Sequence, residues 1–148
     1  MSTTFISYFD RYPEFDHHPR RSIRDEFNRL AKSLKWDRAE SARQRANCYN
    51  DELEGHFALL GITEKLERLQ YLCDELGVEP RRTVAKCKRI LKKTHVNLVD
   101  LMDSRRNNTK VEKFKTLEEL KKYTKNTGKI YPLEFAKGDV VETLLRRI

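Results

Sequence analysis

The stretch LQYLCDELGVEPRRTVAKCKRIL, residues 69–91, predicts two helices joined by a glycine turn. In its first part, leucine and cysteine recur every three or four positions, which is the spacing of one buried helix face. Gly77 follows this pattern directly, and Val78 fits the apolar position that accompanies a glycine helix ending. Thr83 predicts the N-cap of the second helix. Helix, turn and basic helix follow one another in the order of a helix-turn-helix motif.

The second of these helices is the most basic part of the chain. Positions 81 to 93 hold seven lysines or arginines and no acidic residue. Because Cys87 and Leu91 occupy the apolar side, we expect the basic side chains to form an exposed cationic face. Such a face binds polyanions or acidic proteins, although the same density also suits a solvated surface without a partner. The candidate residues are Arg81, Arg82, Lys86, Arg89 and Lys93.

The whole chain has 148 residues, which suits one domain with its own hydrophobic core. Hydrophobic residues make up 38% and charged residues 36%, with five glycines and four prolines, so collagen-like, mucin-like and membrane-spanning proteins are excluded. The net charge is +8 and is distributed unevenly, with −3 on residues 1–79 and +11 on residues 80–148. This distribution predicts a molecule with one positive surface.

Three cysteines, Cys48, Cys73 and Cys87, each fall on an apolar helical stripe, and no two form a CxxC pair. We expect buried, reduced thiols in an intracellular protein. The first residues also lack the basic and apolar regions of a secretion signal. We therefore expect a nuclear or cytoplasmic location and no membrane partner.

The periodic stretches predict an all-α fold, a single orthogonal bundle of six to eight helices over residues 22–148. Ser22 and Thr63 are predicted N-caps, and Thr116 opens a capping box. One short extended segment is expected at 111–114, after a surface loop at 104–110. The expected helices include five that end near positions 35, 60, 76, 102 and 127, one that follows Thr83, and one or two more within 133–148. The expected core contains Phe27, Leu30, Leu34, Leu53, Phe57, Leu69, Leu72, Leu76, Val99 and Leu101.

Residues 1–21 are predicted to form an aromatic N-terminal arm and a connector. Four aromatic side chains have the spacing of one face of a short helix, which Pro13 ends. Because so short a helix is unstable alone, the arm must dock on another surface. Docking on its own domain and self-association between two copies both remain open, since aromatic residues commonly anchor interfaces. The arm residues are Phe5, Tyr8, Phe9 and Tyr12.

Five stretches along the chain resemble a family of short proteins that occur in multiple copies in ascomycete fungi. These stretches are, in order, YFDRYPEFDHHP, EFNRLAKSLKW, LQYLCDELGVEP, THVNLVDLMDSRR and FKTLEELKKYTKNTGKIYP. The resemblance covers most of the chain. It implies a fungal, intracellular origin, and because that family has no established activity it implies no catalytic residues.

Motifs for catalysis and metal binding are missing from the sequence. The four histidines form no HExxH motif, there is no GxSxG turn, and the glycines are too far apart for a phosphate-binding loop. Asp100 and Asp103 are one helical turn apart, and Cys87 and His95 lie in the same region. Solvated acids and a buried cysteine are the simpler interpretation of these residues. We therefore expect no enzymatic activity, no metal and no cofactor.

The sequence favours a non-enzymatic interaction module that binds an acidic partner through the cationic face. The partner is a protein or a nucleic acid, and self-association through the aromatic arm makes a homo-oligomer the further expectation. The alternative is a helix-turn-helix-like DNA-binding domain. The match to that motif is incomplete, because Val84 lies one place later than the usual spacing and Pro80 lies in the turn.

Overall fold

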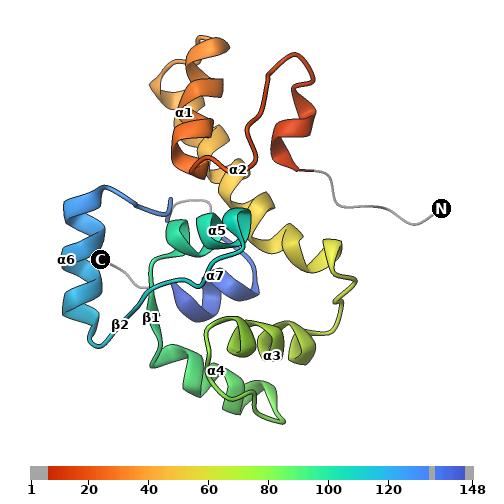
Figure 1. Ribbon diagram of the computed structural model, residues 1–148, viewed down its shortest axis with the longest axis vertical. Coiled ribbons are helices and arrows are strands. Elements are labelled where there is room, and N and C mark those ends of the chain that lie inside the picture. The colour runs from red at the N-terminus through yellow and green to blue at the C-terminus, as the bar shows by residue number, and fades with distance from the viewer. Residues whose placement is uncertain (1–6, 134–135, 146–148) are drawn as a thin grey trace.

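Short helices that cross one another form most of the structure (Figure 1). The computed structural model describes residues 7–133 and 136–145. The described elements are the 3-10 helix η1 (Tyr8–Arg11), α1 (Ile23–Ser33), α2 (Arg38–Leu59), α3 (Lys65–Glu75), α4 (Val84–Lys92), β1 (His95–Val96), α5 (Leu98–Asn107), β2 (Lys113–Phe114), α6 (Leu117–Thr127) and α7 (Asp139–Leu144). The prediction of an all-α bundle of six to eight helices is confirmed.

The two strands pair in antiparallel fashion, with His95 opposite Phe114 and Val96 opposite Lys113. Strand β2 covers the last two residues of the extended segment that the sequence predicts at 111–114. It also connects the beginning of α5 to the beginning of α6, because each strand directly precedes one of these helices. None of the described helices has the length and apolar character needed to cross a membrane.

Three of the four predicted N-cap residues cap their helices. The hydroxyls of Ser22, Thr83 and Thr116 each accept a hydrogen bond from a backbone N–H three residues later, at 3.1, 3.2 and 3.1 Å. Thr63 is wrong as the predicted cap of α3, because Glu64 occupies the N-cap position and no side chain caps the helix. The backbone carbonyl of Thr63 instead accepts a hydrogen bond from the Arg68 side chain.

The predicted surface loop at 104–110 is wrong for its first four residues, because α5 continues to Asn107. Ser104 is buried and its hydroxyl donates to the Leu101 carbonyl at 2.8 Å, which satisfies this polar group inside the helix. Asn108 ends the helix in the left-handed conformation, with a φ of +54°. Asparagine tolerates that conformation better than most residues.

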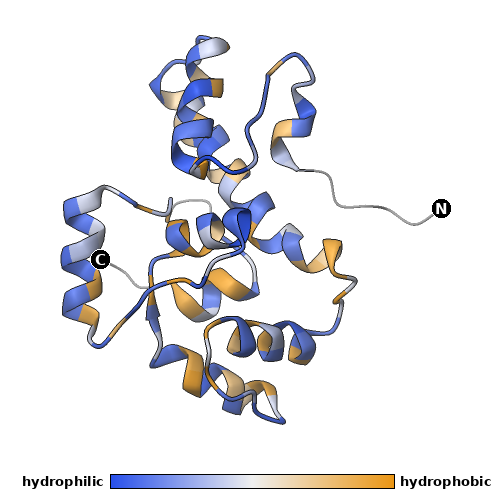
Figure 2. Cartoon of the chain, viewed as in Figure 1, coloured by the Kyte–Doolittle hydropathy of each residue, from blue (hydrophilic) through white to orange (hydrophobic). Residues whose placement is uncertain are grey.

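The hydrophobic core lies between the helices and includes nine of the ten predicted core residues. The exception is Leu34, which is 42% exposed because α1 ends at Ser33. Trp36 covers the same end of the helix instead, with its ring 5.9 Å from that of Phe27 and 5.8 Å from that of Tyr12. In Figure 2 the long helices carry both hydrophobic and hydrophilic residues, as expected for helices with one buried face.

Arg105 connects three helices inside the molecule. Its guanidinium donates to both carboxylate oxygens of Glu75 in α3, at 2.7 and 2.9 Å, and to the Leu53 carbonyl in α2, at 2.9 Å. The side chain of Arg105 is only 9% exposed. This fork-shaped contact is the strong form of ion pair, and it attaches the α3–α4 unit to the centre of the fold.

Candidate functional site: the cationic face of α4

The position of α4 is set by its apolar side and by the turn that precedes it. Cys87 and Leu91 are fully buried, and α4 packs on α3 and α7. The turn after α3 has the predicted glycine ending. The Val78 N–H donates to the Cys73 carbonyl at 2.9 Å, and the Gly77 N–H donates to the Asp74 carbonyl at 3.1 Å. Gly77 has a φ of +71°. The opposite side of α4 is therefore presented outward.

All five predicted residues of the cationic face are exposed. Four of them, Arg81, Lys86, Arg89 and Lys93, surround a surface depression of about 460 Å³ together with Ile90. Arg82, the fifth predicted residue, does not line this depression. The Arg81 carbonyl accepts hydrogen bonds from Gln70 at 2.8 Å and from the Cys87 thiol at 3.4 Å, which hold Arg81 beside α4.

These five cations have no acidic neighbour in ion-pair contact within the described residues. Lys88 of the same helix differs, because its ammonium lies 3.2 Å from the Glu142 carboxylate of α7. The positive charges around the depression are therefore not neutralised locally. Adjacent like charges raise the local potential and attract an anionic partner.

The helix-turn-helix interpretation meets two structural differences. The connector between α3 and α4 runs from Leu76 to Thr83, whereas the motif has a turn of about three or four residues. In addition, α3 exposes Glu67 and Asp74, which would repel phosphates. The five exposed cations of the predicted face thus belong to α4 and to Arg81 and Arg82 just before it, not to both helices of the pair.

The aromatic arm lies on its own chain. In the described part of the helix predicted over positions 5–12 there is a single turn, η1, in which Tyr8 and Phe9 are fully buried and pack on α2. The Tyr8 hydroxyl donates to Gln44 at 2.6 Å, and Arg11 pairs with Asp51 at 2.6 Å. Docking within the chain is one of the two arrangements that the sequence leaves open. Tyr12 is half-buried, and Phe5 lies outside the described residues.

The candidate carboxylate pair has separate structural roles. Asp100 accepts hydrogen bonds from the Tyr123 hydroxyl at 2.5 Å and the Lys129 ammonium at 2.8 Å. Asp103 accepts the backbone N–H of Ile23 at 2.8 Å, and burial raises the pKa of its carboxyl. Asp100 thus connects α5 to α6 and the segment after it, and Asp103 connects α5 to the start of α1.

Cys87 and His95 also lack the surroundings of a catalytic pair. The Cys87 thiol donates to the Arg81 carbonyl, while His95 pairs in β1 and its Nδ1 is buried without a hydrogen-bond partner among the described residues. Within the described residues, no group of three or more His, Cys, Asp or Glu side chains could hold a metal ion.

Two titratable residues that sequence analysis missed lie on α2. Burial raises the pKa of Glu54 to about 7, although its carboxylate accepts the Val140 N–H at 3.3 Å. Burial also lowers the pKa of His56 to about 4, and its Nε2 lies 2.9 Å from the Tyr71 hydroxyl. Glu54 borders a cleft of about 940 Å³. No local sequence pattern marks either residue, because their burial depends on α7 and α3.

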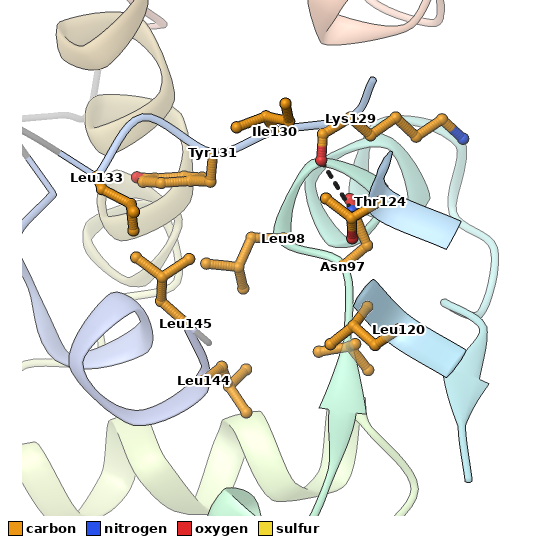
Figure 3. Close-up of a pocket in the computed structure, with 11 residues that line it drawn as sticks. Asn97, Leu98, Leu120, Thr124, Lys129, Ile130, Tyr131, Leu133, Leu144 and Leu145 are labelled. Atoms are coloured by element: carbon orange, nitrogen blue, oxygen red, sulfur yellow. Dashed lines mark hydrogen bonds between the residues drawn. The ribbon is translucent and has the colours of Figure 1, made fainter. Parts of the chain in front are cut away.

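Figure 3 shows a small apolar pocket between β1, α6 and α7. The side chains of Leu98, Leu144 and Leu145 lie around it, and its volume is about 50 Å³. On one side the Asn97 amide donates to Thr124 Oγ1 at 3.1 Å and to the Lys129 carbonyl at 2.9 Å. Since one water molecule accounts for about 30 Å³ of liquid, this pocket is too small for an organic ligand.

The depression on α4 is therefore the site that best combines exposure, charge and convergence of side chains.

Comparisons of the chain with models of known protein families, with curated proteins and with solved structures found no match.

Proposed function

We propose that the protein is a non-enzymatic interaction module whose α4 face binds an acidic partner. The observation that carries this proposal is the convergence of Arg81, Lys86, Arg89 and Lys93 around one depression, with no carboxylate of the described residues in ion-pair contact with them. Fixed charges of one sign around a hollow favour a ligand of the opposite sign, because their mutual repulsion falls when the ligand binds.

The partner favoured by the surroundings is an acidic segment of a protein. Such a segment needs to reach only the depression itself, where Ile90 offers an apolar contact at the centre of four cations. A DNA duplex would extend over a longer surface and would meet the exposed carboxylates of Glu67 and Asp74 on α3. A single compact group of cations also contacts fewer phosphates than a continuous stripe along the duplex would.

The second candidate function is DNA binding of the helix-turn-helix type. It is supported by the order of α3 and α4 and by the outward basic side of α4. In that arrangement α4 would enter the major groove. The long connector and the acidic residues of α3 make this the less favoured candidate.

The experiment compares a fluorescent acidic peptide, such as a run of Glu and Asp with one Phe, with a 20-base-pair duplex by anisotropy at several salt concentrations. The test variant is K86E/R89E/K93E. The matched control is K110E/K122E/K125E, which changes the net charge equally at exposed lysines in the 108–112 loop and in α6. We expect the Kd for the peptide to increase in the test variant by a factor at least ten times larger than in the control variant.

Equal losses in the two variants would contradict the proposal, because they would mean that only the net charge matters. For DNA binding, the affinity of the wild-type protein for duplex would decrease with salt with a log–log slope of about −0.9 per neutralised phosphate. If the duplex binds tightly with a slope that the test variant flattens, and the peptide does not bind, the second candidate replaces the first. If neither probe binds at low salt, the cationic face has no role in binding.

A further inference from the structure

A second positively charged cleft lies far from α4. It has a volume of about 400 Å³ and is bordered by α1, the first half of α2 and the segment after α6. Its lining includes Arg24, Asn28, Arg45, Tyr49, Ile130 and Pro132. In Figure 1, α1 and α4 lie at opposite ends of the longest axis of the molecule, so the two clefts are separate sites.

Arg45 is held in place by neutral groups. Its guanidinium donates to the Tyr49 hydroxyl at 3.1 Å and to the Asn28 side-chain oxygen at 2.5 Å, and it lies 4.6 Å from the centre of the Phe27 ring. Stacking on an aromatic ring and two hydrogen bonds fix the plane of the guanidinium. Three of its five N–H groups remain without a partner among the described residues.

Arg24 is positioned in a similar way from the other side. It lies one helical turn before Asn28 on α1, and its guanidinium donates to the Thr127 carbonyl at 2.7 Å. Gly128 gives this side chain room, because a Cβ there would lie 3.3 Å from Arg24 Nη1. No carboxylate of the described residues is in ion-pair contact with Arg24 or Arg45.

Two oriented guanidinium groups without acidic partners are the arrangement that recognises an oxyanion. Each guanidinium can form two parallel hydrogen bonds to a phosphate or carboxylate. The Asn28 amide nitrogen adds a neutral donor, since its oxygen already accepts from Arg45. Beside these donors the cleft is apolar: Ile130 is 61% exposed, and Pro132 and Ala42 line the same space.

We propose that this cleft binds a small phosphate ester that carries an apolar group, with the phosphate on Arg24 and Arg45 and the apolar group on Ile130 and Pro132. The phosphate is favoured over a carboxylate because it has three oxygens for two guanidinium forks and an amide donor. The exposed isoleucine then gains a contact that the protein itself does not provide.

The test is a nitrogen-15 NMR titration of the full chain, at constant ionic strength, that follows the arginine Nε–H signals and the Gly128 amide. The probes are inorganic phosphate, phenyl phosphate and benzoate. We expect saturable shifts at Arg24, Arg45 and Gly128, with phenyl phosphate binding at least fivefold tighter than inorganic phosphate and benzoate weaker than phenyl phosphate. R24Q and R45Q should each weaken phenyl phosphate at least tenfold.

The control variant is R43Q, which removes an exposed arginine of α2, the helix that also contains Arg45. Arg43 pairs with Glu40 at 2.8 Å, and its replacement should leave binding of phenyl phosphate unchanged. R24K keeps the charge but loses the fork, and it should bind more weakly than wild type while folding normally. Because K86E/R89E/K93E should bind phenyl phosphate as wild type does, failure of the α4 proposal and failure of this one are distinguishable. Linear, unsaturated shifts, shifts confined to α4, or equal binding by R24Q and wild type would overturn the proposal.

Discussion

The backbone N–H of Tyr8 donates a 2.8 Å hydrogen bond to the Glu52 carboxylate, which also accepts the Ser7 hydroxyl at 2.7 Å. One side chain of α2 therefore binds the start of η1 through two donors. Together with the buried rings of Tyr8 and Phe9, this contact makes the aromatic arm an integral part of the core.

The first prediction concerns that arm. Phe9→Ala should lower the free energy of unfolding by about 3–5 kcal/mol, the usual cost of removing a fully buried ring. Tyr12→Ala should cost clearly less, because Tyr12 is only half-buried. Chemical denaturation measures both values. Light scattering on the same samples should give the mass of one chain, and a dimer that dissociates on Phe9→Ala would instead assign the arm to self-association.

The second prediction compares two glycines with positive φ. At Gly138, with a φ of +112°, a Cβ would overlap the Glu54 carboxylate, while at Gly61, with a φ of +73°, a Cβ would meet no atom within 4 Å. Gly61→Ala should therefore cost only the backbone strain, about 1–2 kcal/mol. Gly138→Ala should cost more, because Glu54 must also move. Thermal melts of the two variants test this order, and equal melting temperatures would contradict it.

The third prediction is a pH dependence with two opposing parts. Burial and, to a lesser extent, the nearby Asp139 carboxylate raise the pKa of Glu54 from 4.5 to about 7. The neutral form of Glu54 is therefore favoured in the folded state, and this stabilisation, complete below pH 4.5, is lost as the pH rises toward about 7. The lowered pKa of His56, caused by burial and by Arg105, acts oppositely: stability is lost as the pH falls from 6.5 toward about 4. The two contributions largely cancel in the wild type.

Single substitutions should separate these two contributions. In Glu54→Gln the His56 contribution remains, so the free energy of unfolding should rise between pH 4 and 6.5. The destabilisation that ionised Glu54 causes in the wild type at pH 8, roughly 3 kcal/mol, should be absent from this variant. His56→Gln should leave a stability that falls between pH 4.5 and 7. Urea denaturation across this range measures both profiles. If the two variants have the same pH profile as the wild type, neither residue titrates in the way that its burial requires.

The fourth prediction concerns the thiols. Burial and the neighbouring Cys87 thiol raise the pKa of Cys73 to about 12, and burial raises that of Cys48 strongly. Because the thiolate is the reactive form, the native protein should react with a disulfide reagent orders of magnitude more slowly than the unfolded protein. Full reaction of the three thiols in denaturant is the control. Rapid labelling of Cys73 under native conditions would show that α3 and α4 separate readily.

The sequence predicted those parts of the fold that depend on local signals. Thr83, Gly77 and the apolar spacing around Cys87 define α3, its ending and α4 without reference to the rest of the chain. Ser22 and Thr116 act in the same way at α1 and α6. In each case the hydrogen bond is made within four residues, so the information is contained in a short window.

The incorrect predictions depend on distant contacts. Ser104 begins a polar run that is typical of a loop, but the partners of the arginines that follow it lie in other parts of the chain: Arg105 binds Glu75, and Arg106 binds the Arg21 carbonyl at 2.8 Å. The position of Arg81 at the α4 depression also depends on a contact between segments, the hydrogen bond from Gln70 of α3. The cleft between Arg24 and Arg45 combines three separate segments, and helical periodicity contains no information about such a combination.

Because the guanidinium of Arg105 joins α5 to α3, the backbone amides of these two helices should exchange with solvent in one cooperative opening. If α3 and α4 opened alone, Glu75 would leave with α3, and Arg105 would lose its charged partner inside a poorly hydrated interior, which has a large free-energy cost. Amides of α3 and α5 should therefore exchange with solvent deuterium at similar, slow rates. In Arg105→Met the α3 amides should exchange faster than those of α5, because the helices then open as separate units.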